Sequence, residues 1–301
     1  MFEPLSLHHQ AEIEQALARF KRGEGAHCLS DHSFANFYLF RQAHQYRYAA
    51  GARPCLLGQT YDGQACVLPL FDVSQVAAPE LRDLCQQWGL TDAVFFPVAE
   101  SQLQALSPAD FAWQAHRDDA DYVYAADQFR HYPGAVLHKK RNLVRQLLSA
   151  HEVTAQAYDP SCAADAQAVL ADWMQAKGKA AGEADEAPCL EALQLADRLG
   201  LQGFFFRADG QPAGFVLAET LAPGVWAMRF AKGVDRFKGI YQHMFQHVCL
   251  ARPNVQWLNF EQDLGVENLR HTKMSYQPTH LLSKYRVRFS QLTQDSASAA
   301  V

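Results

Sequence analysis

Two carboxylates separated by one residue stand directly after a short apolar segment of the chain. A strand is predicted over residues 255–260, and Glu261 and Asp263 follow it. Ligands of α/β proteins usually bind beyond the carboxyl ends of strands, so this pair could deprotonate an incoming amine or hydroxyl, or hold a substrate ammonium. Spacing alone favours a second interpretation, in which Asp263 caps a helix that begins near Val266 and Glu261 is merely solvated.

A basic turn that contains glycine is the second candidate site. A strand over residues 225–231 runs into this turn, and a helix follows from Ile240. The turn carries Lys232, Arg236, Lys238 and Gly239. The N–H groups and the positive dipole end of a helix N-terminus attract anions, and the neighbouring cations add charge. The segment therefore predicts an anion site, and a solvated loop that needs glycine for its turns is an equal alternative.

A basic helix predicted over residues 134–148 is the third candidate. Its basic residues are Lys139, Lys140, Arg141 and Arg145. Lys140 falls in the middle of the apolar face of this helix. An ammonium group is costly to bury without a partner, so we expect Lys140 to reach a functional cleft or to pair with a buried carboxylate, Asp121 or Asp263. A plain solvated helix is the alternative.

The predicted C-terminal strand, residues 279–289, carries a largely basic row on one face. The row consists of His280, Leu282, Lys284, Arg286 and Arg288. It would suit a phosphate-rich ligand, but an edge strand that charge protects against aggregation is the commoner cause of such a row. We therefore expect an edge strand.

Composition limits the classes of function. The 301 residues are 49% hydrophobic and 20% charged, with a formal net charge of −5. Such a chain can bury two cores, and as a whole it is not an electrostatic nucleic-acid binder. None of the seven cysteines forms a C-x-x-C pair, so we expect free thiols in a reducing compartment.

The remaining sequence features predict a cytoplasmic protein without a metal. The N-terminal segment lacks the basic and apolar regions of a signal peptide, and no run approaches the ~18 apolar residues of a membrane span. His8-His9 and the pair His243/His247 are the only closely spaced histidines. No carboxylate or cysteine beside the second pair completes a metal site.

Two halves of similar length each combine helices with a hairpin signal. Asp62-Gly63 and Asp209-Gly210 each separate two apolar strands, which predicts two hairpins. Helices are expected over residues 9–21, 79–88, 163–176, 189–199, 240–251 and 266–275. We predict an α/β fold of two lobes whose mixed sheets are flanked by helices, with a mobile loop over residues 177–188. The predicted parts are an N-terminal lobe (1–155), a C-terminal lobe with the active site (156–292) and a disordered tail (293–301).

Several short motifs occur in one order along the chain. They are Asp121-Tyr122-Val123-Tyr124, His138-Lys139-Lys140-Arg141-Asn142, Phe230-Ala231-Lys232, Gly239-Ile240-Tyr241-Gln242, Asn259-Phe260-Glu261-Gln262-Asp263-Leu264-Gly265, Leu269-Arg270 and Lys273-Met274-Ser275-Tyr276-Gln277-Pro278. In this order they resemble the bacterial family related to the soluble C-terminal domain of phosphatidylglycerol lysyltransferase, over roughly residues 20–290. The resemblance implies a tandem GNAT-like fold, akin to the Fem-type aminoacyl-tRNA-dependent transferases.

The resemblance also implies a reaction, which is aminoacyl or acyl transfer to an amine or hydroxyl without a metal or a covalent enzyme intermediate. By matching positions, acceptor and donor would meet near Glu261, Asp263, Arg270 and Lys273. The two carboxylates would hold or deprotonate the attacking group, and the two cations would stabilise the developing oxyanion.

Two donors fit this resemblance, an aminoacyl-tRNA and an acyl-CoA. The phosphates of a tRNA acceptor end would meet the basic helix at Lys139, Lys140 and Arg141. The pyrophosphate of coenzyme A would meet the segment 236–241, where Tyr241 replaces the usual small residue and would crowd it. The acceptor would be a small or lipid-like molecule. A non-catalytic module that binds an amino acid or a phosphorylated ligand is a third hypothesis.

Overall fold

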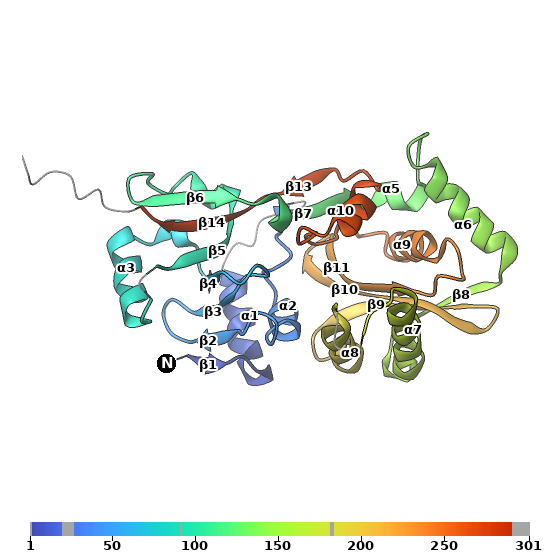
Figure 1. Cartoon of the computed structure of the whole chain (residues 1–301), viewed down its shortest axis with the longest axis horizontal. Coiled ribbons are helices and arrows are strands. Elements are labelled where there is room, and N and C mark those ends of the chain that lie inside the picture. The colour runs from blue at the N-terminus through green and yellow to red at the C-terminus, as the bar shows by residue number, and fades with distance from the viewer. Residues whose placement is uncertain (1, 20–26, 91, 181–183, 291–301) are drawn as a thin grey trace, which may run out of the picture. The chain divides into compact units, whose positions relative to one another are not determined.

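The computed structural model describes residues 2–19, 27–90, 92–180 and 184–290. The chain forms two compact units (Figure 1). Unit 1 consists of Met1–Lys21, Ala43–Arg117 and Ser283–Val301, and unit 2 of Arg22–Gln42 and Asp118–Leu282. The predicted tail, residues 293–301, and part of the predicted loop 177–188 lie outside the described residues.

A seven-stranded mixed sheet forms the centre of unit 1, in the order β1-β2-β3-β4-β5-β14-β6. Its strands are β1 (Glu3–Pro4), β2 (Arg47–Ala49), β3 (Cys55–Gln59), β4 (Ala65–Pro69), β5 (Val94–Ala99), β6 (Phe111–Ala115) and β14 (Lys284–Phe289). The helices of this unit are α1 (Gln10–Arg19), α3 (Ala78–Gln87) and α4 (Glu100–Leu103). β4 and β5 are parallel and are connected through α3, whose buried Leu81 packs into the same core as Phe95.

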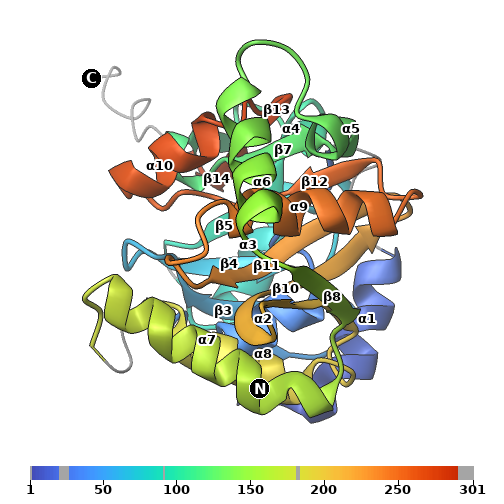
Figure 2. The ribbon, with the colours of Figure 1, turned by 90° about the vertical axis from the view of Figure 1, so that its right-hand side faces the viewer.

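Unit 2 has a second seven-stranded mixed sheet, in the order β13-β7-β12-β11-β10-β9-β8. Its strands are β7 (Asp121–Ala125), β8 (Val153–Ala157), β9 (Leu201–Ala208), β10 (Gln211–Ala222), β11 (Val225–Gly233), β12 (Trp257–Asn259) and β13 (His280–Leu282). Its helices are α2 (Phe34–Leu39), α5 (Ala126–His131), α6 (His138–Ala150), α7 (Ala163–Ala176), α8 (Glu186–Leu195), α9 (Ile240–Ala251) and α10 (Glu267–Met274). α9 covers one face of the β9–β11 region, and α7 and α8 cover the other (Figures 1 and 2).

Local sequence explains these elements. The apolar residues of α9 recur at helical spacing, and Ile240, Met244 and Val248 are buried against the sheet. Both predicted hairpins are confirmed, since β3 pairs with β4 and β9 with β10. In the second, Asp209 and Gly210 both have positive φ, 52° and 74°, as the favoured two-residue hairpin turn requires.

The two halves of the chain exchange their last strands. β7 lies between β12 and β13 in the second sheet, and β14 lies between β5 and β6 in the first. The units therefore divide the chain differently from the predicted lobes 1–155 and 156–292: β7, α5 and α6 belong to unit 2, and Ser283–Val301 to unit 1. Local patterning identifies a strand but not its distant partner, so the exchange could not be read from hairpin signals.

The predicted edge strand over residues 279–289 is wrong in two respects. It is two strands in different sheets: β13 does lie at an edge of the second sheet, but β14, which carries Lys284, Arg286 and Arg288, pairs on both sides. Lys284 and Arg286 are buried, and Arg286 donates a hydrogen bond to Asp62 at 2.8 Å. The basic row therefore does not protect an edge.

The expected fold class is confirmed. The chain is an α/β protein with two mixed sheets flanked by helices. All seven cysteines are free and buried. Among the described residues, none of the helices is long and apolar enough to cross a membrane.

Candidate active site

The loop after β12 holds the two carboxylates singled out from the sequence. Glu261, Leu264 and Gly265 all have positive φ, at 59°, 56° and 75°. At a residue other than glycine this conformation costs about 1–3 kcal/mol and persists only where the surroundings enforce it. Lys273 of α10 supplies much of that support, because its Nζ donates to the carbonyl oxygens of residues 260–262 at 2.6, 3.2 and 2.6 Å.

Asp263 is fully buried and tightly bound within this loop. Arg270 donates to both carboxylate oxygens at 2.9 Å, Tyr122 donates its hydroxyl, and the Gly265 N–H donates at 3.0 Å. Burial alone would raise the pKa of Asp263, but the hydrogen bonds from Arg270 and Tyr122 outweigh it and lower the pKa to about 2. Asp263 is therefore a stable anion at neutral pH.

The alternative in which Asp263 is a simple helix cap is wrong. The N-cap of α10 is Val266, and no side chain accepts a hydrogen bond there. The Asp263 carboxylate binds Arg270 instead, and only its backbone carbonyl accepts the Val266 N–H.

Glu261 lies in a different environment. Its side chain is 20% exposed, and its Oε1 accepts a hydrogen bond from Arg229. Burial raises the pKa of Glu261 even though the charges of Arg229 and Lys273 act to lower it. Within the described part of the chain no hydrogen bond reaches its second oxygen, Oε2. Glu261 is thus a carboxylate that can accept a proton, and it is not merely solvated.

Arg229, in the middle of β11, is the centre of the site. Its side chain is completely buried and donates hydrogen bonds to the carboxylates of Glu219 and Glu261, the Ser30 carbonyl, the Ser33 hydroxyl and the Asn36 amide oxygen. Burial acts to lower the pKa of Arg229, but the two carboxylates raise it, so the guanidinium stays charged.

A second buried group connects this cluster to the strained loop. Asp121, at the start of β7, accepts hydrogen bonds from the N–H and hydroxyl of Ser30 at 2.7 and 2.8 Å and from the Asn259 amide at 3.0 Å. The Asn259 Oδ1 accepts the N–H of Glu261 at 2.7 Å. Strands β7 and β12 thereby hold the backbone at Glu261.

Sequence reasoning missed Arg229, Glu219 and the segment that carries Ser30 and Ser33. One signal was present, since Arg229 is the only charged residue of the predicted strand 225–231, and a charge there needs a buried partner. Glu219 is 10 residues away on the neighbouring strand, but Ser33 is 196 residues away, so no local pattern could identify the whole set of partners.

Two cations of the predicted anion site are paired with the protein's own carboxylates. Lys232 donates to both oxygens of Asp185 at 2.7 and 2.9 Å, and its Nζ lies 3.7 Å from the centroid of the Trp173 ring. Arg236 pairs with Asp172 at 3.3 Å, and Lys238 is exposed. These cations are not brought to the Glu261 loop by any hydrogen bond or ion pair of the described residues.

The start of α9 is also covered. A Cβ added to Gly239, which has φ 99°, would lie 2.3 Å from the carbonyl oxygen of Leu143 in α6. The Tyr241 hydroxyl accepts the N–H of Gly233 at 3.1 Å. Helix α6 and Tyr241 therefore fill the space around the turn.

Lys140 pairs with neither predicted carboxylate. It donates to the Ser275 hydroxyl at 2.8 Å and lies 4.0 Å from the centroid of the Tyr276 ring. Burial lowers the pKa of Lys140. Arg141 donates to the carbonyl of Tyr132, while Lys139 is exposed. The expectation of Asp121 or Asp263 as partner is wrong, because α6 faces the end of α10 and meets an aromatic ring there.

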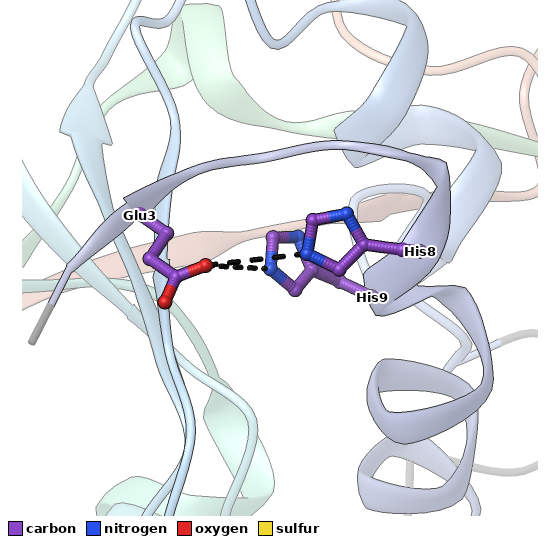
Figure 3. Close-up of side chains that lie close together, drawn as sticks. All are labelled: Glu3, His8 and His9. Atoms are coloured by element: carbon purple, nitrogen blue, oxygen red, sulfur yellow. Dashed lines mark ion pairs between the residues drawn. The ribbon is translucent and has the colours of Figure 1, made fainter.

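One group of side chains in unit 1 has the composition of a metal site. Glu3, His8 and His9 lie together (Figure 3), with the histidine Nε2 atoms 4.0 and 3.7 Å from the Glu3 Oε2. However, the Ser6 N–H donates to the Nδ1 of His9 at 3.2 Å, so a neutral His9 carries its proton on Nε2. A metal would need the lone pair of that atom. The group fits an imidazole–carboxylate contact better than a metal centre.

Solved structures define the class of fold. A conserved protein of unknown function from Bacteroides thetaiotaomicron matches with a TM-score of 0.80 and 21% identity, over 96% of this chain and 99% of that chain. L-PGS from Bacillus licheniformis matches with a TM-score of 0.62 and 13% identity, over 96% and 93%. FemX matches with a TM-score of 0.60 and 9% identity, over 96% and 97%. These likenesses confirm the predicted tandem GNAT-like fold.

The sequence family follows from a direct match. The family model described as phosphatidylglycerol lysyltransferase, C-terminal, matches residues 25–288. The chain belongs to this family, and the resemblance predicted over residues 20–290 is confirmed. Comparison with curated protein sequences gives no match.

Proposed function

We propose that unit 2 catalyses the transfer of an aminoacyl group from an activated ester to an amine or hydroxyl acceptor, with Glu261 as the proton acceptor. The observation that carries this proposal is the contrast between two carboxylates on one strained loop. Asp263 has a pKa lowered to about 2, and the pKa of Glu261 is raised. Paired carboxylates whose environments separate their pKa values are typical of acid–base sites.

The proposed step balances without a metal or a covalent enzyme intermediate. The acceptor nitrogen or oxygen attacks the ester carbonyl carbon and forms the new bond, while Glu261 takes the acceptor's proton. The tetrahedral intermediate then expels the ester oxygen, which leaves as a hydroxyl with the proton that Glu261 took from the acceptor, so that Glu261 returns to the carboxylate. Positioning and charge stabilisation supply most of the rate in such a reaction.

The two cations of α10 that bind this loop receive different roles. All three protons of the Lys273 ammonium can be taken by backbone carbonyl oxygens, so we assign Lys273 to holding the loop. The side chain of Arg270 is 36% exposed, and its Nη1 donates no hydrogen bond within the described ranges. This supports Arg270, held by Asp263 and Asp118, as the group that faces the developing oxyanion.

Aminoacyl-tRNA is the donor that the observations favour. Lys232 and Arg236 are already paired with carboxylates, and α6 covers the start of α9 where a pyrophosphate of coenzyme A would bind. The exposed cations of α6, Lys139 and Arg145, remain available to phosphates of an acceptor end. A small molecule and a lipid-like molecule are both candidates for the acceptor.

The test supplies purified chain with tRNA charged with a mixture of labelled amino acids, and with small amines and lipid vesicles as acceptors. Label transferred to an acceptor supports the proposal. Glu261→Gln should lower the rate about 10²–10⁴-fold, and the matched control Glu267→Gln, which changes an exposed glutamate of α10, should leave it unchanged. Transfer from acyl-CoA alone would overturn the choice of donor, and ligand binding without any turnover would favour a non-catalytic module.

A further inference from the structure

The guanidinium of Arg229 uses every one of its nitrogens. Nε and Nη2 donate to the same oxygen of Glu219 at 3.0 and 2.9 Å, and Nη1 donates to Glu261. Nη2 also donates to the Ser30 carbonyl at 2.8 Å and the Ser33 hydroxyl at 2.9 Å. A planar guanidinium bound on all sides cannot rotate, so the Oε1 of Glu261 is held in one place.

Stability alone does not require this arrangement. Removing two carboxylates and a guanidinium from water is expensive, and apolar residues of similar volume often serve a fold equally well. One guanidinium here serves two carboxylates, whose side chains are 13% and 20% exposed. The arrangement leaves Glu261 with one fixed and one accessible oxygen.

A segment far from β11 in sequence completes the arrangement. Ser33 is the N-cap of α2, where its hydroxyl accepts the Asn36 N–H at 3.0 Å and donates to Glu219 at 2.7 Å. Ser30 in turn is held by Asp121. The position of Arg229 therefore depends on residues 30–36 as well as on the sheet.

We propose that Arg229 is a positioning residue of the active site, which fixes Glu261 through a network completed by Glu219 and Ser33, and that residues 30–36 are part of that site. The proposal rests on the proposed function, because it assigns Arg229 to the same proton acceptor. Arg229 does not meet the reacting atoms, since its side chain has no exposed surface. It acts through the orientation of Glu261.

The experiment compares Arg229→Lys with Arg41→Lys. Arg41 is a matched control in the same unit, because it forms a two-point ion pair with Glu191 at 2.7 and 2.9 Å. Lysine keeps the charge but cannot hold two carboxylates and two further acceptors together. In the transfer assay we expect Arg229→Lys to lower kcat about 10–100-fold with KM within about two-fold, and Arg41→Lys to change neither.

The pH profile separates positioning from a general structural role. Glu261 must be deprotonated to accept a proton, so the acid limb of kcat follows its pKa. Arg229 acts to lower that pKa, and Arg229→Lys should therefore move the acid limb to higher pH. Guanidinium added to Arg229→Ala should restore part of the rate, whereas it should not affect Arg41→Ala. Equal losses of rate and thermal stability in the two lysine variants, with unmoved profiles, would overturn the proposal.

A third measurement does not depend on turnover. Carboxyl-labelled glutamate gives a titration curve for Glu261 by NMR, and Glu261→Gln assigns its signal. Arg229→Lys should raise the midpoint, and Ser33→Ala, which keeps Arg229, should raise it less. An unchanged midpoint in a folded Arg229→Lys protein contradicts the proposal even if no donor is found for the wild type. A shifted midpoint together with no transfer from any donor would instead reject the proposed function alone.

Discussion

The two sheets have the same plan but different chemistry. In unit 1 the parallel pair β4–β5 is joined through α3, and in unit 2 the parallel pair β11–β12 is joined through α9. In each sheet a strand from the other half of the chain lies beside this pair, β14 next to β5 and β7 next to β12. At the parallel pair, unit 1 matches Val67 with Phe95, and unit 2 matches Ala227 with Asn259, which binds Asp121. Unit 1 shows that the parallel strand pair can be built from apolar residues, so the polar Asn259 in unit 2 indicates a function.

The ends of the corresponding strands differ in the same way. β5 runs into α4, where the Gln102 side chain accepts the Ala99 N–H at 3.0 Å and binds Asp72 at 2.8 Å. β12 runs instead into a loop with three left-handed residues, held by Lys273 and Asp263. The comparison indicates that unit 2 carries strain at the place where unit 1 carries an ordinary helix start. The effects of substituting residues that hold the loop should therefore be distinguishable from the effects of substituting the residue that reacts.

The largest stability effect is expected for Asp263→Asn. The buried carboxylate would lose its charge and at least one hydrogen bond to Arg270, which costs about 2–3 kcal/mol for a charged group. Denaturant unfolding with an unchanged m-value measures this loss. Glu261→Gln should change stability by far less, so equal destabilisation by the two variants would remove the distinction between holding and reacting carboxylates.

Lys273→Met should come next. The variant keeps most of the side-chain volume but removes the ammonium donor from three carbonyl oxygens of the strained loop, at a cost of about 1–2 kcal/mol. The Glu261 carbonyl oxygen keeps the Tyr122 N–H at 3.2 Å. Hydrogen exchange should accelerate at residues 260–265 before the rest of unit 2 opens. Gln102→Met, the matched change after β5, should affect exchange only near α4. Unaltered exchange in the loop of Lys273→Met would show that other contacts suffice to hold it.

Acid stability should depend on Asp263 in a defined window. Its pKa is about 2 in the folded chain against a usual 3.8, so the unfolded state binds the proton more tightly. The contribution of Asp263 is therefore complete above about pH 4 and disappears as pH falls through 2. Thermal unfolding between these values should be less steeply pH-dependent in Asp263→Asn than in the wild type. Identical slopes would contradict the lowered pKa.

Much of the fold was predictable because it depends on local patterns. The bounds of α7 and α9 follow apolar periodicity, and Asp263 with Glu261 stood out by position after a strand. The exchange of β7 and β14 was not predictable, since pairing is decided by distant partners. The two sheets have corresponding strand orders, but the two Asp-Gly turns occupy different places in them. The first joins β3 to β4, and the second joins β9 to β10, which is one hairpin earlier in the order.

The smallest effect concerns the surface of α6. Of the lysines and arginines of α6, only Lys139 and Arg145 are exposed, because Lys140 and Arg141 make contacts inside the protein. If α6 meets tRNA, Lys139→Gln with Arg145→Gln should weaken tRNA binding a few-fold and reduce the salt dependence by about two counterions. The double variant should fold normally, whereas Lys140→Gln should destabilise the chain because it loses the contacts of Lys140 with Ser275 and Tyr276.

The measurement is tRNA binding at two salt concentrations, with Arg53→Gln in unit 1 as the control. An unchanged salt slope in the double variant would place the tRNA contact elsewhere and leave α6 a covering helix for the start of α9.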